Sequence, residues 1–273
     1  MSAREAAADA SRRLAAAGVE DARFEAELLA REAAGISRAE YFAGSVLDAE
    51  ESARFAAWVT RREQREPAAY ITGHREFYGR DFGVGAGVLV PRPETELLVD
   101  LGVQELDRDP AAIVVEAGTG SGAVAVSIAA ERPAARVIAT EVSGDAMRFA
   151  RANAAALAPH TGLVLGDLVT AVSRADVVLA NLPYIPAWEI EALEPEVSRW
   201  EPRVALDGGD DGYALIRRLI EDCATRLRPR LLALEVGFGQ AADVAAILAG
   251  YGLDAWFVKD LAGIDRIVCG RWE

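Results

Sequence analysis

The chain has 273 residues, of which 52% are hydrophobic and 26% charged, so it can bury the core of one or two globular domains. Its formal net charge of −14 argues against a nucleic-acid surface, because such a surface needs clustered Lys and Arg. No apolar run is long enough to span a membrane, and the N-terminus lacks the apolar core of a signal peptide.

Cys223 and Cys269 are the only cysteines, and neither lies among residues at metal-ligand spacing. They are expected to be buried thiols in a reducing compartment, and no metal site is predicted. The sequence also shows neither a signal peptide nor an apolar run long enough to span a membrane. It therefore indicates a cytoplasmic protein without membrane contacts.

Residues 1–66 are predicted to be helical, because Ala, Glu, Arg and Leu dominate and the apolar residues recur at helical spacing. Three glycines divide the segment into three or four helices, and Asp48 begins a capping box with Glu51. The segment is expected to form a small helical domain whose role is to dock a partner.

Residues 67–91 are predicted to link this domain to the next through a β-hairpin, with strands at 81–84 and 88–90 around a Gly-Ala-Gly turn. The following stretch, Pro-Arg-Pro-Glu-Thr-Glu, opens a helix whose first turn suits Pro93. That helix does not account for Arg92, which is locked between two prolines, so Arg92 is expected to face a site.

From residue 112 onward strands and helices alternate, which is typical of a doubly wound, Rossmann-like α/β sheet. Strands are predicted at 113–116, 136–140, 163–165, 177–180, 231–236, 254–259 and 266–269, and helices at 97–106, 123–131, 144–156, 212–226 and 239–249. The last two strands have no helix between them, so they are expected to pair as an antiparallel hairpin at the sheet edge. The sequence therefore predicts a seven-stranded domain over residues 92–273.

A glycine-rich turn follows the first strand of this domain and leads into a helix. Its residues are Gly118, Thr119, Gly120, Ser121 and Gly122. The pattern is neither the dinucleotide fingerprint nor a P-loop, so it has no dedicated pyrophosphate cradle. A ligand with one nucleoside, such as S-adenosylmethionine, fits this turn better than NAD does.

Acidic residues stand at or just beyond the ends of three predicted strands. Glu141 lies about 20 residues after Gly118, where such folds place the residue that binds ribose hydroxyls. Asp167 is placed to accept from an adenine amine, with Leu168 packing on the ring, and Glu116 is placed to meet the methionine ammonium. Each carboxylate taken alone could instead be a capping or solvated residue, but their shared position favours nucleoside binding.

Asn181-Leu182-Pro183-Tyr184 follows another buried strand, at the edge of the sheet where ligands bind. The Asn181 amide oxygen and the Leu182 carbonyl could each accept one N–H of a planar NH2 group, and Tyr184 could offer a flat face beside it. These residues are the predicted catalytic group. The alternative is a strand end followed by a Pro turn, with Asn181 bonded to local backbone.

Together these stretches resemble the PrmC/HemK family, the class I methyltransferases that modify a glutamine of translation release factors. The resemblance covers nearly the whole chain, and its motifs are Tyr-Ile-Thr-Gly at 70–73, Arg-Pro-Glu-Thr-Glu at 92–96, the glycine loop at 116–122, Asn-Leu-Pro-Tyr at 181–184 and Glu-Pro-Arg at 201–203. It implies a monomer whose N-terminal bundle docks a peptide chain release factor. It also implies a catalytic domain that uses S-adenosylmethionine, releases S-adenosylhomocysteine and methylates the glutamine of a Gly-Gly-Gln motif.

The chain departs from the family pattern at three positions. The family usually has Pro where Leu182 stands, and more often Asp at the positions of Glu116 and Glu141. Asn-Leu-Pro-Tyr also resembles the motif of ribosomal-RNA adenine dimethyltransferases, which lack both the N-terminal bundle and the Arg-Pro-Glu-Thr-Glu stretch. A cofactor-binding module without catalysis and a paralogue acting on a small-molecule amide are further alternatives.

Overall fold

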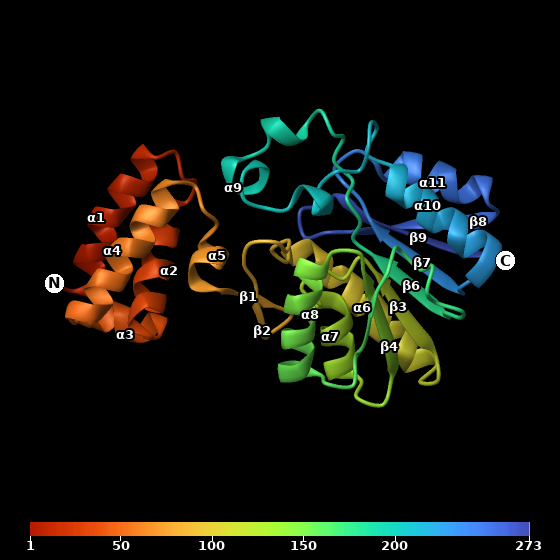
Figure 1. Ribbon diagram of the computed structural model, residues 1–273, viewed down its shortest axis with the longest axis horizontal. Helices are drawn as coiled ribbons and strands as arrows, with labels where there is room; N and C mark the ends of the chain where they lie inside the picture. Colours follow the sequence, from red (N-terminus) through yellow and green to blue (C-terminus); the bar gives the residue numbers. More distant parts are fainter. Residues whose placement is uncertain (273) are drawn as a thin grey trace. The chain divides into compact units, whose positions relative to one another are not determined.

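The computed structural model describes residues 1–272, and these divide into two compact units (Figure 1). One unit contains residues 1–74 together with 194–200, and the other contains residues 75–193 and the described chain from 201 onward. A helix long and apolar enough to cross a membrane is not found among the described residues.

The first unit is helical. Its helices are α1 (Ala3–Ala16), α2 (Ala22–Ala34), α3 (Arg38–Ala43), α4 (Ala49–Glu63), α5 (Ala68–Thr72) and the short α9 (Pro195–Ser198). The predicted capping box at Asp48 is confirmed, since its side chain accepts the Glu51 N–H at 2.8 Å while Glu51 accepts the Asp48 N–H. Gly35 and Gly44, in the left-handed conformation, end α2 and α3 as predicted.

Ion pairs hold residues 194–200 on this unit. Glu196 bonds to Arg62 at 2.7 Å and to Arg65 at 2.6 Å, and Glu194 bonds to Arg65 at 2.9 Å. The Arg62 side chain is only 3% exposed, and it also pairs with Glu25 of α2. Because a buried guanidinium needs such partners, α9 completes the charge balance of the helical unit.

The predicted hairpin lies earlier in the chain than the sequence indicated. β1 (His74–Phe77) pairs with β2 (Arg80–Gly83), so the expected pairing of residues 81–84 with 88–90 is wrong. The turn falls at Tyr78 and Gly79, which both have positive φ, as a two-residue hairpin turn requires. Tyr at such a position gives no turn signal in the sequence, whereas Gly-Ala-Gly gave a misleading one.

The described part of the second unit forms a seven-stranded sheet of order β5-β4-β3-β6-β7-β9-β8. Its strands are β3 (Ile113–Ala117), β4 (Arg136–Glu141), β5 (Gly162–Leu165), β6 (Val177–Ala180), β7 (Leu231–Glu235), β8 (Leu253–Lys259) and β9 (Asp265–Trp272). All pairs from β5 to β7 are parallel, while β9 runs antiparallel to both β7 and β8. The predicted doubly wound sheet with an antiparallel edge hairpin is therefore confirmed.

Helices cover both faces of the sheet (Figure 1). On one face lie α6 (Glu96–Arg108), α7 (Ala123–Glu131) and α8 (Gly144–Leu157), and on the other lie α10 (Ala214–Asp222) and α11 (Ala241–Gly250). Consecutive residues of one strand supply both cores: Val114 packs in the first and Val115 in the second. This explains why the central strands are continuous apolar runs rather than alternating patterns.

The remaining segments are short. The 3-10 helices η1 (Pro93–Thr95), η2 (Ile190–Ala192) and η3 (Arg203–Ala205) lie in connections on the second unit. The helix predicted over 212–226 begins later, at Ala214, and ends as a π-helix (Cys223–Leu227), because Arg228 then turns into the left-handed conformation. Cys223 and Cys269 are buried free thiols, as predicted.

The strand order reverses between β3 and β6, because β4 lies on one side of β3 and β6 on the other. Ala117 and Ala180, the last residues of these neighbouring strands, stand side by side. The glycine loop and Asn181 therefore leave the sheet at the same point, where open α/β folds bind their ligands.

Candidate active site

A cavity of about 370 Å³ opens at the carboxyl ends of β3, β4, β5 and β6. Most residues singled out from the sequence line it: Arg92, Glu116, Gly118, Thr119, Gly120, Ser121, Glu141, Asp167, Leu168, Asn181, Leu182 and Pro183. Of the predicted site residues in the described chain, Gly122 and Tyr184 lie outside the lining. Residues from four separate strand ends thus surround one space of the size that a nucleoside ligand needs.

The glycine loop forms a tight wall of this cavity. Gly118, Gly120 and Gly122 all have positive φ, which a residue with a Cβ rarely adopts. The N–H groups of Gly118 and Thr119 donate to the Thr140 carbonyl at 3.0 and 2.9 Å, which joins the loop to β4. A Cβ on Gly118 would lie 3.0 Å from Leu182 Cδ2, so the loop and the end of β6 approach closely.

Glu116 is a buried carboxylate that faces the cavity without a cationic partner in the described chain. It is 3% exposed, and it accepts hydrogen bonds from the Thr119 hydroxyl and, at 2.9 Å, from the Ala125 N–H. Burial raises the pKa of Glu116 to about 8, and the two hydrogen bonds oppose this rise only partly. A ligand ammonium at this point would supply the missing positive charge, so the site fits the amino group of S-adenosylmethionine.

Glu141 supports the glycine loop from the end of β4. One of its oxygens accepts the Gly120 N–H at 2.8 Å and the other accepts the Ser143 N–H at 2.8 Å. The carboxylate is 7% exposed and lines the cavity. Because each carboxylate oxygen has a second lone pair, Glu141 can hold the loop and still accept hydrogen bonds from two ribose hydroxyls.

Asp167 and Leu168 bound the cavity beyond β5. The Asp167 carboxylate pairs with Arg218 at 2.5 Å, and both side chains are about half exposed. Leu168 is 6% exposed and adopts a positive φ of 46°, which turns its side chain into the core. An adenine amine would therefore meet a carboxylate that Arg218 already holds in one orientation.

The Asn181 amide nitrogen is hydrogen-bonded within the protein, whereas its amide oxygen can accept a hydrogen bond from a ligand. Nδ2 donates to the Thr95 hydroxyl at 3.0 Å, whereas Oδ1 has no hydrogen-bond partner among residues 1–272. Both residues line the cavity. The bond to Thr95 therefore presents the acceptor end of the Asn181 amide, which is the end that an N–H group requires.

Leu182, Pro183 and Tyr184 divide into two environments. Leu182 is 3% exposed and packs on Gly118, while Pro183 lines the cavity. Tyr184 packs beside Gly237, whose missing Cβ would lie 3.1 Å from the Tyr184 ring, and burial raises the pKa of Tyr184 to about 12. Tyr184 is not among the residues that line the cavity, so its role of packing on an acceptor amide stays a prediction.

Arg92 lies on the cavity lining and is anchored to a buried acid. It donates to Glu201 at 2.7 Å, and the other Glu201 oxygen accepts the Val90 N–H at 3.3 Å. Burial raises the pKa of Glu201, although Arg92 acts in the opposite direction. This pair connects the chain before α6 to the Glu-Pro-Arg stretch, and it explains why an arginine stands between two prolines.

Several lining residues escaped sequence reasoning. The sequence indicates Thr95 only as part of a helix start and predicts Val88 and Leu89 in a strand, yet all three line the cavity. Arg218, on α10, is far from every motif in sequence. Thr95 alone carried a usable signal, since it lies inside the Arg-Pro-Glu-Thr-Glu stretch.

Known structures share this fold. The catalytic domain of hMettl16, solved with a MAT2A 3'UTR hairpin, aligns with a TM-score of 0.59 at 16% identity and covers 82% of each chain. The T. thermophilus 16S rRNA N2 G1207 methyltransferase, solved with AdoMet and guanosine, aligns with a TM-score of 0.50 at 14% identity over 73% of this chain and 50% of that one. A family model described as the methyltransferase small domain matches residues 94–192. The fold is one that these methyltransferases share, and the family model identifies residues 94–192 as a methyltransferase domain.

Sequence comparison specifies the family. A model described as the PrmC N-terminal domain matches residues 5–73. The release factor glutamine methyltransferase of Geobacter sulfurreducens is 40% identical over 94% of this chain and 92% of its own length. That of Cereibacter sphaeroides is 43% identical over 97% and 98%. The chain belongs to the release factor glutamine methyltransferase family, which confirms the resemblance found in its motifs.

Proposed function

We propose that this protein transfers a methyl group from S-adenosylmethionine to the side-chain amide nitrogen of a glutamine in a peptide chain release factor, within its Gly-Gly-Gln motif. The observation that carries the proposal is the orientation of Asn181, whose oxygen is free to accept an N–H while Thr95 occupies its nitrogen. Release factors act in the cytoplasm, which agrees with the two free thiols.

Asn181 and the Leu182 carbonyl would hold the two N–H groups of the acceptor amide. When bound, S-adenosylmethionine supplies a methyl group made electrophilic by its sulfonium. The glutamine nitrogen forms a bond to the methyl carbon as the carbon–sulfur bond breaks, and the extra proton leaves the nitrogen afterwards. Because an amide lone pair is delocalised, orientation is the main contribution of these two acceptors, and it can supply up to about 7–11 kcal/mol in well-oriented reactions.

Three acids would hold the cofactor around the glycine loop. Glu116 would pair with the ammonium, Glu141 would accept from the ribose hydroxyls, and Asp167 would accept from the adenine amine. The close approach of Gly118 to Leu182 supports a short path between the sulfonium side of the cavity and Asn181. Gly118, Thr119, Gly120 and Ser121 would line the ligand with backbone rather than bulky side chains.

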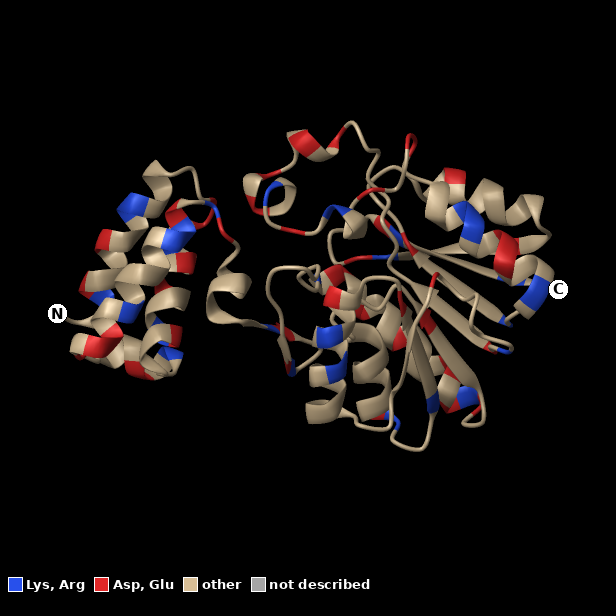
Figure 2. Ribbon diagram, viewed as in Figure 1, with Lys and Arg blue, Asp and Glu red and all other residues tan. Residues whose placement is uncertain are grey.

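A protein acceptor agrees better with the charge of the molecule than RNA does. The chain carries 29 Lys and Arg against 43 Asp and Glu, and Figure 2 shows the two signs interspersed along the helices of both units. Binding to a phosphate backbone would require basic residues gathered on one face. The helical unit is proposed to dock the release factor.

Radiolabelled methyl transfer to a release factor, to ribosomal RNA and to a free Gly-Gly-Gln peptide, measured side by side, tests this proposal. Label is expected on the release factor and specifically on its Gly-Gly-Gln glutamine, with a Gln→Asn variant of that residue as the unlabelled control. Label on ribosomal RNA alone, or on none of the three, would contradict it.

A further inference from the structure

Glu235 is a buried carboxyl next to Asn181 that the mechanism above does not use. In the parallel pair β6–β7, Ala180 stands beside Leu234, so the next residues along the two strands are Asn181 and Glu235. Glu235 is 2% exposed, and its Oε2 has no hydrogen-bond partner among the described residues. A buried carboxyl with an unpartnered oxygen is costly, which points to a role beyond packing.

The groups that face Glu235 come from three directions. The Thr95 hydroxyl lowers the pKa of Glu235, and so do the positive charges of Arg266 on β9 and of Arg92. The negative charge of Glu94 raises it. Burial is the largest influence and raises the pKa to about 7. Arg266 is paired with Asp260 at 3.2 Å, and among the described residues no direct ion pair joins Arg266 to Glu235.

Thr95 bonds to Asn181 and is close enough to Glu235 for its hydroxyl to lower the pKa of that carboxyl, and the hydroxyl has one hydrogen to give. If that hydrogen points to an ionised Glu235, the Thr95 oxygen can only accept, and Asn181 must then offer its Nδ2, which is the bond that the structure shows between Asn181 and Thr95. When Glu235 is protonated and donates to Thr95, the hydroxyl hydrogen is free to point at Asn181. The favoured orientation of the amide is then reversed, with Nδ2 toward the cavity.

We propose that Glu235, acting through the Thr95 hydroxyl, fixes the Asn181 amide with its oxygen toward the cavity, and that Thr95 and Glu235 are positioning residues for methyl transfer. This inference rests on the proposed function. Reversal of the amide would place donors against the N–H groups of the acceptor, so the ionised form of Glu235 is the active form. Neither residue needs to touch the reacting atoms.

Isosteric changes at Thr95 test the connection. Thr95→Val, which removes the hydroxyl and keeps the shape, is expected to lower kcat by roughly 10- to 100-fold, the range for removing an outer hydrogen-bond partner of an active group. The KM for the release factor and the cofactor Kd should stay within about threefold. Thr95→Ser should restore most of kcat. Thr161→Val is the matched control, because Thr161 is a buried hydroxyl bonded to the Ala158 carbonyl and lies outside the cavity lining.

The pH profile tests the part played by Glu235. In the wild type, kcat should rise with pH through about 7, because deprotonation of Glu235 gives the active orientation. Glu235→Gln should lower kcat and remove this step, with its melting temperature and cofactor Kd used to exclude misfolding. A retained step in Glu235→Gln, or an undiminished kcat in Thr95→Val, would overturn the inference while leaving the proposed function standing. A wild type that does not methylate release factor would overturn both.

Discussion

Asn181 differs from its neighbours in having one end of its side chain bound and the other end free. Asn181→Ala is expected to keep cofactor binding and to lower turnover at least about 100-fold, the scale of losing one preorganised partner of a reacting group. Single-turnover methyl transfer and calorimetric titration with S-adenosylmethionine would separate the two effects. Gln104→Ala, at an exposed position on α6, should change neither. Unchanged turnover in Asn181→Ala would remove the assigned role.

Glu116 should make cofactor binding depend on pH. Because burial raises its pKa to about 8, Glu116 is largely protonated below that value and must release its proton to pair with an ammonium. Cofactor affinity is therefore expected to increase from pH 6 to 7.5, by at most about tenfold per pH unit. Titration calorimetry at several pH values would measure the slope.

Glu116→Gln supplies the control for that slope. The variant should bind the cofactor more weakly at pH 7.5 and show little pH dependence, since the titrating group is gone. The same raised pKa means that the folded protein binds more protons than the unfolded chain between about pH 4 and 8, so this group destabilises the fold increasingly as pH rises. A wild-type affinity that does not change with pH would show that Glu116 does not meet the ammonium.

Residues whose place on the cavity follows from backbone position could be predicted from the sequence. The glycines could be predicted because only a residue without Cβ adopts their positive φ at a close approach, and the acids because they follow strand ends. Thr95 carried a signal only as part of the Arg-Pro-Glu-Thr-Glu stretch, and Glu235 carried none, because their importance comes from Asn181, which lies about 86 and 54 positions away in the chain. The close approach of the Tyr184 ring to Gly237 could not be predicted either, because the two residues are about 53 positions apart in the chain.

At the scale of elements, the contact between the glycine loop and β6 should be intolerant of a single methyl group. Gly118→Ala introduces a Cβ at φ +75°, 3.0 Å from Leu182 Cδ2, with strain of about 1–3 kcal/mol. If the loop relieves this by moving, cofactor affinity should fall by about tenfold or more. Gly144→Ala is the control, because nothing lies within 4 Å of its Cβ. Equal affinities for the two variants would contradict the tight wall.

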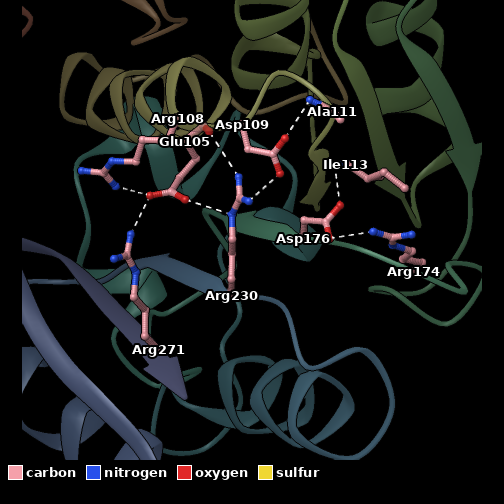
Figure 3. Close-up of polar contacts among 9 residues, drawn as sticks. All are labelled: Glu105, Arg108, Asp109, Ala111, Ile113, Arg174, Asp176, Arg230 and Arg271. Atoms are coloured by element: carbon pink, nitrogen blue, oxygen red, sulfur yellow. Dashed lines mark hydrogen bonds and ion pairs between the residues drawn. The ribbon is translucent and has the colours of Figure 1, made fainter. Parts of the chain in front are cut away.

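A second connection between elements lies at the amino ends of the parallel strands, at the opposite end of the sheet from the cavity. Figure 3 shows Glu105 of α6 between three arginines. It accepts from Arg108 of the same helix, from Arg230 just before β7 at 3.1 Å and from Arg271 of β9 at 2.6 Å. Its side chain is only 4% exposed, so the carboxylate joins a helix to two strands in a poorly solvated place.

Removal of this charge should cost more than removal of an outer partner. Glu105→Gln is expected to destabilise the second unit by about 1–3 kcal/mol, because it weakens three charge-assisted hydrogen bonds to a buried carboxylate, while the arginines that lose it are 37–61% exposed and stay hydrated. Arg108→Ala should cost less than about 1 kcal/mol, since Arg108 is 61% exposed. Urea unfolding followed by near-ultraviolet circular dichroism would compare them. Equal losses would mean that Glu105 acts only as a surface ion-pair partner.

The central strands could be predicted well because β3, β6 and β7 are nearly continuous apolar runs between turn residues, and the helices because their apolar residues recur at helical spacing. The position of the hairpin could not be predicted. Tyr78 adopts a positive φ that tyrosine rarely adopts, and the glycines that follow it in the sequence indicate a later turn. The π-helical end at 223–227 could not be predicted either, because its residues continue an ordinary helical pattern. These differences lie where tertiary packing overrides local preference.

For the whole molecule, the sequence indicated a helical part followed by a catalytic part, with a boundary near residue 66. The described chain divides at 74–75 and assigns residues 194–200 to the helical unit. Ion pairs such as Arg65 with Glu196, which are 131 residues apart in the chain, join this segment to the unit. A contact between residues so far apart in the chain leaves no local sequence pattern. The place of residues 194–200 in the helical unit could therefore not be predicted from composition or periodicity.

The return of residues 194–200 to the helical unit means that this unit is assembled from two pieces of one polypeptide. Proteolytic cleavage between residues 74 and 75 would break the only covalent link between fragment 1–74 and the fragment that begins at residue 75. Arg62 and Arg65 of the first fragment would still form ion pairs with Glu194 and Glu196 of the second. The nicked molecule would therefore behave as a heterodimer of its own fragments, co-eluting on a sizing column until denaturant separates them.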